Sequence, residues 1–77
     1  MTEEQELLVI FMEEVAEAAV EASKLLRFGK SNLETEIGDV MCMITLLEEQ
    51  GYIDMRTVMM CADAKREKLK KWSNLKV

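Results

Sequence analysis

Residues 36–44 read Glu-Ile-Gly-Asp-Val-Met-Cys-Met-Ile, and this stretch decides how the whole chain is interpreted. Apolar and polar residues do not alternate in it as they would in a half-buried strand, whereas a helical repeat groups them well. At about 100° per residue, one stripe of that helix contains Glu36, Asp39, Val40, Met43 and Leu47. The segment therefore predicts a helix whose core-facing stripe begins with two acids.

The chain as a whole is equally suited to helices, because it has no proline, three glycines and many strong helix formers. Thr2 followed by Gln5 has the form of a capping box, and so does Ser31 followed by Glu34. These pairs predict the starts of two helices.

Glycines mark the helix ends. Gly29 and Gly51 stand where a C-terminal glycine belongs, and Asp54 can cap a third helix. We predict helices over about 3–28, 32–50 and 55–73. Their connections are short, so consecutive helices are expected to pack antiparallel. The chain, residues 1–77, is then a single all-α domain. A core of this size is small, and oligomerisation is expected to support it.

The composition excludes several classes of function. The net charge of -5 disfavours binding to a nucleic acid polymer, because acidic proteins repel phosphate backbones. A zinc site is not expected, since the chain has no histidine and no Cys-x-x-Cys. Its two cysteines, Cys42 and Cys61, are expected to be buried as small apolar residues. Neither a membrane span nor a signal peptide is recognised, which favours the cytoplasm.

Acids occupy apolar stripes on the first two predicted helices. The stripe of the first helix reads Leu7, Ile10, Glu14, Glu17, Ala18, Glu21 and Leu25. On the second, Asp39 has apolar neighbours nearly all round, and an isolated buried carboxylate is costly. No lysine or arginine lies between Lys30 and Arg56 to pair with it. The simplest alternative is that the acids of the first helix form a solvated face.

Side chains three residues apart project from the same face of a helix. Glu14 with Glu17, and Glu36 with Asp39, can therefore present four carboxylates to one cation. Oxygen ligands without nitrogen or sulfur favour a hard cation, Mg²⁺ or Mn²⁺. A di-iron bundle typically also uses histidine, which this chain lacks.

Glu13-Glu14-Val15-Ala16-Glu17, then eighteen residues, then Glu36-Ile37-Gly38-Asp39 resembles the EExxE…ExxD signature of the MazG-like all-α nucleoside triphosphate pyrophosphohydrolases. That family includes MazG proteins, dimeric dUTPases and dCTP pyrophosphatases. The resemblance covers roughly residues 5–73. It implies that Glu14, Glu17, Glu36 and Asp39 bind Mg²⁺ and that Glu13 lies beside the metal. It also implies hydrolysis between the α- and β-phosphates, and subunits that pair into a helical-bundle dimer, possibly a tetramer.

Candidate catalytic residues are Glu13, Glu14 and Glu17, since a carboxylate near the metal can take a proton from the attacking water. The family holds phosphates with basic residues after ExxD, which makes Lys65 and Lys68 the candidates here. The alternative for these lysines is a solvated face at a helix C-terminus.

Aromatic and apolar residues near the helix ends are candidates for a base-binding pocket. Trp72, with Phe28 and Leu25, could stack on the substrate base, or could instead form core or subunit contacts.

Two other functions remain open at this point. The chain could be a non-catalytic helical interaction module, or a regulatory homologue that binds nucleotide without turnover. The base and sugar preference of an enzyme are also left open, because they depend on a pocket that one sequence does not reveal.

Overall fold

The computed structural model describes residues 1–77 as three helices without a strand: α1 (Glu3–Phe28), α2 (Leu33–Glu49) and α3 (Met55–Trp72). The prediction of an all-α chain with three helices is confirmed. The helix boundaries agree with the predicted ones to within a residue. None of the helices combines the length and the apolar character that a membrane crossing requires.

Most of the predicted helix ends are confirmed. Thr2 and Gln5 form the capping box at the start of α1, each side chain accepting a hydrogen bond from the backbone N–H of the other residue. Gly29 and Gly51 have φ angles of 74° and 82°, the left-handed conformation that glycine adopts easily after a helix. Asp54 caps α3 by accepting the backbone N–H two residues further on.

The predicted capping box of Ser31 and Glu34 is wrong. The N-cap of α2 is Asn32, whose side chain makes no capping hydrogen bond. Ser31 Oγ accepts the Leu33 N–H, and the Asn32 N–H donates to the carboxylate of Glu21 on α1. The acceptor that replaces a local cap thus comes from another helix.

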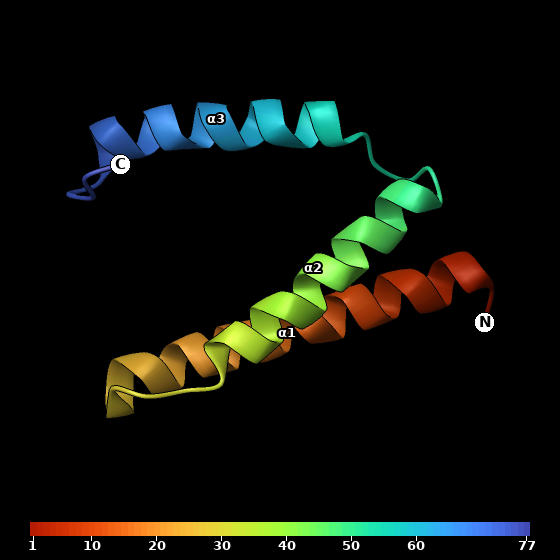
Figure 1. Ribbon diagram of the computed structural model, residues 1–77, viewed down its shortest axis with the longest axis horizontal. Helices are drawn as coiled ribbons and strands as arrows, with labels where there is room; N and C mark the ends of the chain where they lie inside the picture. Colours follow the sequence, from red (N-terminus) through yellow and green to blue (C-terminus); the bar gives the residue numbers. More distant parts are fainter.

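Helices α1 and α2 form an antiparallel hairpin, and α3 leaves the far end of α2 and runs back at an open angle (Figure 1). Met43 and Leu47 of α2 are the buried apolar residues. Near its start α3 places Val58 beside an apolar groove that Leu8 and Phe11 also line. The expectation that α2 and α3 pack antiparallel against each other is therefore wrong for the single chain, since the extensive helix contact is between α1 and α2 and no residue of α3 is buried.

The single chain is more open than a typical globular domain of its length. Its radius of gyration is 14.8 Å, whereas a compact chain of this length is expected to have a radius of gyration of about 11.5 Å. Cys42 and Cys61 are exposed, so the expectation that they are buried is wrong for the isolated chain. Large apolar side chains such as Met12 and Met60 are exposed as well. A substantial apolar surface is left without a partner.

Candidate functional site

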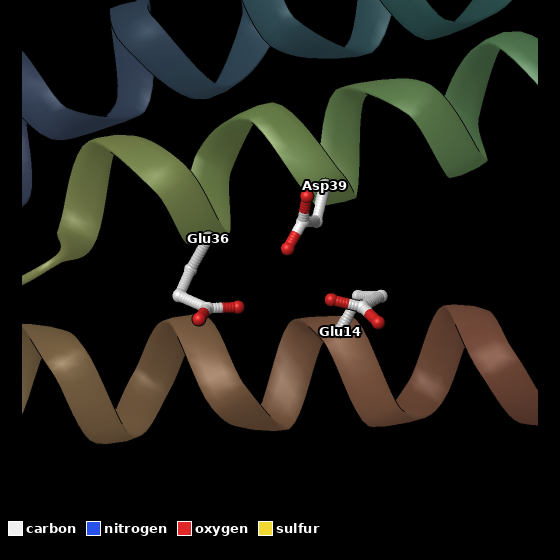
Figure 2. A group of neighbouring side chains, drawn as sticks. All are labelled: Glu14, Glu36 and Asp39. Carbon is white, nitrogen blue, oxygen red and sulfur yellow. The ribbon is translucent and has the colours of Figure 1, made fainter.

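Four carboxylates meet between α1 and α2. Glu14 from α1 points toward Glu36 and Asp39 from α2 (Figure 2), and an oxygen of each lies within 4.8 Å of an oxygen of the others. The fourth, Glu17, lies beside Glu36 and acts on it through its charge. The structure thus brings together the four acids that the resemblance assigns to a cation, three of them within 4.8 Å of one another.

The antiparallel packing of the hairpin explains this convergence. Glu14 and Asp39 face each other across the two helices, and one turn nearer the connection Glu17 faces Glu36. Residues three apart on a helix are separated by about 4.5 Å along its axis. The two pairs therefore stack as successive rungs on one face of the hairpin.

The electrostatics of the cluster disfavour four free negative charges. Burial, followed by the charges of Glu17, Asp39 and Glu13, raises the pKa of Glu14. Burial and the nearby carboxylates of Glu17, Asp39 and Glu14 raise the pKa of Glu36. The Oε2 atoms of Glu14 and Glu36 are buried without a hydrogen-bond partner. A bound proton or a cation would relieve this repulsion.

The donor set suits a hard divalent cation, because every available ligand atom is a carboxylate oxygen. Acidic side chains also gather on helical surfaces without a cation. What distinguishes this cluster is that two of its oxygens are withdrawn from water and lack a donor. Glu14, Glu36 and Asp39 can contact one ion directly, and Glu17 adjoins the group.

Asp39 is not enclosed by apolar side chains in the single chain. It is exposed, and so are its neighbours Ile37, Met41 and Cys42. The premise that Asp39 is a buried acid is therefore wrong for the single chain. Its exposure leaves the cluster open to a ligand from solvent.

The other predicted site residues lie apart from the acids or at their edge. Glu13 is exposed and close enough to Glu14 to contribute to its raised pKa. Lys65, Lys68 and Trp72 are exposed on α3, with Trp72 84% exposed. The ion pairs of the chain are Lys24–Glu21 and Lys70–Glu67, so no lysine of α3 pairs with the four acids.

Leu25 lines an open hollow of about 550 Å³ at the connection between α1 and α2. The other residues lining it are Lys30, Ser31, Leu33, Glu34 and Ile37. Phe28 does not line this hollow and is exposed beneath the guanidinium of Arg27, 5.1 Å from the ring centre. The three residues considered for a base-binding pocket, Leu25, Phe28 and Trp72, thus do not line one hollow in the single chain.

Sequence reasoning assigned no role to Glu21, although it lies on the same stripe as Glu14 and Glu17. It is 8% exposed, the one buried charged residue of the chain. Its acceptance of the Asn32 N–H, and then its pairing with Lys24, lower its pKa. The available signal was its position on the stripe opposite the start of α2, where a helix N-terminus has free N–H groups.

Comparison of the chain with protein-family models, curated proteins and solved structures gives no match. The resemblance to the MazG-like hydrolases therefore rests on the two acidic motifs and their spacing.

Proposed function

We propose that this protein is a Mg²⁺-dependent hydrolase that converts a nucleoside triphosphate and water into the monophosphate and pyrophosphate in the cytoplasm. The observation that carries the proposal is the pair of facing carboxylate rungs, Glu14 with Asp39 and Glu17 with Glu36. Their spacing in the sequence matches the EExxE…ExxD signature. Two buried oxygens without donors support the same conclusion, because they suit a cation better than water.

The position of each acidic residue in the site indicates its role in the proposed reaction. When bound, Mg²⁺ (or Mn²⁺ in its place) neutralises triphosphate charge and favours in-line attack by water on the α-phosphorus. Glu14, Glu17, Glu36 and Asp39 supply the oxygen ligands. Glu13 is exposed beside Glu14, where it can accept a proton from the attacking water. Glu14 and Glu17 are the other candidates for that proton transfer.

Substrate contacts are proposed for the basic end of α3. Lys65 and Lys68 can hold phosphate oxygens, and Trp72 offers an exposed ring on which a base can stack. In the single chain α3 is splayed away from the hairpin (Figure 1). These residues therefore need the closure of α3, or a second subunit, to approach a nucleotide held at the acids.

A second copy of the chain is the partner we propose for the exposed apolar surface, giving a homodimer of helical-bundle type that can pair again into a tetramer. A groove between α1, α2 and the start of α3 has an entirely apolar lining: Leu8, Phe11, Ile44, Leu47, Tyr52, Ile53 and Val58. Together with other exposed apolar side chains such as Met12 and Met60, this groove offers apolar surface of the kind that an interface covers.

The same apolar surface favours a second candidate function, a helical interaction module without catalysis. The two candidates differ in their dependence on divalent metal. An interaction module needs no cation, so its stability and its associations are unaffected by Mg²⁺. A regulatory homologue would bind Mg²⁺ and nucleotide without releasing pyrophosphate.

The deciding experiment measures pyrophosphate release from a panel of ribo- and deoxyribonucleoside triphosphates, with Mg²⁺, with Mn²⁺ and with EDTA. Asp39→Asn should abolish release while helix content is retained. The matched control is Asp63→Asn, an exposed acid on α3, which should leave the rate unchanged. The hydrolase proposal would be refuted if no substrate released pyrophosphate and the melting temperature did not change on addition of Mg²⁺.

A further inference from the structure

Glu21 occupies an unusual place for a charged side chain. Three of the 77 residues are buried. Two of them are the apolar residues Met43 and Leu47, and the third is Glu21. Glutamate is almost never buried unless it is paired. Burying it here therefore requires contacts that compensate for lost hydration.

Two contacts provide that compensation, and one of them joins the two helices. Glu21 Oε1 accepts the backbone N–H of Asn32 at 2.8 Å, and Glu21 Oε2 pairs with Lys24 Nζ at 2.9 Å. Asn32 is the N-cap of α2 and has no side-chain capping bond of its own. A carboxylate at this end also interacts favourably with the helix dipole. One side chain of α1 thus holds the start of α2.

The Glu21–Asn32 contact lies in the same antiparallel register as the acidic site. Glu21 is four positions after Glu17, and Asn32 is four positions before Glu36. The bond is therefore a further rung in line with the two carboxylate rungs, nearer the connection. A slip of α2 by one residue would move its side chains by about 1.5 Å along the axis and about 100° around it. Such a slip would separate the facing acids.

No apolar residue is fully buried near the connection. The buried apolar residues Met43 and Leu47 lie beyond Asp39, on the opposite side of the acids from Glu21. The acids themselves repel one another and have no cationic partner. At the connection end, Glu21 is the one buried residue available to align the helices.

We propose that Glu21 is a positioning residue, whose bond to the Asn32 N–H holds α2 in the register that brings Glu14, Glu17, Glu36 and Asp39 together. The proposal rests on the proposed function in so far as those acids bind a divalent cation. The alignment itself is a property of the hairpin and can be measured without metal. Glu21 touches neither substrate nor metal in this role.

The test compares Mn²⁺ binding, followed by electron paramagnetic resonance, in the full chain and its variants. Glu21→Ala should weaken Mn²⁺ binding by about 10- to 100-fold, the usual effect of losing a group that orients metal ligands. Glu21→Gln keeps an acceptor oxygen and should restore binding close to the wild-type value. Lys24→Ala, which leaves the Asn32 bond intact, and Glu4→Ala, at an exposed position of α1, should have little effect.

A metal-free readout separates this proposal from the proposed function. Nuclear Overhauser contacts between the side chains of Glu17 and Glu36 should be present in wild type and Glu21→Gln and lost in Glu21→Ala. If wild type keeps these contacts but binds no Mn²⁺, the metal site fails while the register role of Glu21 stands. Unchanged contacts and Mn²⁺ affinity in Glu21→Ala would overturn the role.

A second pair of variants distinguishes a loss of helix register from a general loss of stability. Leu7→Ala shortens a half-buried side chain near the start of α1, far from the connection and outside the apolar groove. It should lower the melting temperature without weakening Mn²⁺ binding in the folded protein. Asn32→Pro removes the N–H donor and leaves Glu21 in place. It should weaken Mn²⁺ binding as Glu21→Ala does, and it decides the question if Glu21→Ala does not fold. Wild-type affinity in Asn32→Pro, or an equal loss in Leu7→Ala, would overturn the proposal.

Discussion

Placing a carboxylate in the apolar groove should dissociate the proposed homodimer. Leu8 lines the groove together with residues of α2 and the start of α3, and it is 41% exposed in the single chain. Leu8→Asp therefore adds a charge that an isolated subunit can hydrate. In a dimer that covers the groove, the same charge would be desolvated.

The expected magnitude follows from the surface of the chain. It exposes 6426 Å², whereas a compact monomer of its mass of 8.9 kDa is expected to expose about 4,800 Å². Two chains that each bury the excess would cover about 3,200 Å², inside the range of obligate homodimers. Burying an unpaired charge costs several kcal/mol, and a two-fold interface contains it twice. A loss of about 4 kcal/mol of association free energy raises the dissociation constant of the dimer about a thousandfold.

Sedimentation equilibrium over a wide concentration range measures this effect. Wild type should have twice the mass of one chain or a higher multiple, and Leu8→Asp should shift to the mass of one chain. The matched control is Leu26→Asp, which is 89% exposed at the end of α1 and should not change the mass. Circular dichroism reports whether each variant keeps its helices. A wild-type protein that sediments as one chain throughout would refute the reasoning.

Further predictions concern the hairpin. Gly38→Ala adds a methyl group where no atom lies within 4 Å, so it should stabilise α2 by about 1 kcal/mol in thermal melts; destabilisation would show that a second subunit packs against Gly38. Leu47→Ala, at a buried site, should cost about 2–5 kcal/mol in urea unfolding; a negligible loss would contradict the core assignment. Because the folded-state pKa values of Glu14 and Glu36 are raised, their protonation should stabilise the metal-free protein fully below the ordinary glutamate pKa of 4.5, and this contribution should be lost as pH rises through the raised values. Melting curves in EDTA should show this dependence, Mg²⁺ should suppress it, and a Glu36→Gln variant with an unchanged profile would contradict it.

Local signals made the helices predictable from the sequence. The capping box of Thr2, the left-handed glycines and the Asp54 cap are local features. The partner of each lies within a few residues along the chain, so a short stretch of sequence is enough to recognise it. The convergence of the acids was also predictable, because short connections force α1 and α2 to run antiparallel. The start of α2 was not, because the acceptor for the Asn32 N–H is Glu21 on another helix.

Position in space, rather than helix content, is where sequence reasoning was weakest. Residues of α3 fit a helix well, but their apolar side chains give no indication of which surface they cover. Lys65, Lys68 and Trp72 could therefore be chosen by residue type and not by location. All three are exposed, and neither lysine forms an ion pair with the acids.

The exposure of Asp39 connects the site with the assembly. Its sequence neighbours are apolar, which led to the expectation of a buried acid, yet Ile37 and Met41 are exposed in the single chain. Apolar residue types at exposed positions are explained if another surface covers them. A second subunit that packs against this part of α2 would lower the dielectric around the acids and strengthen their need for a cation. Leu8→Asp should then weaken Mn²⁺ binding as it separates the subunits, whereas Mn²⁺ affinity that survives dissociation would place the complete site within one chain.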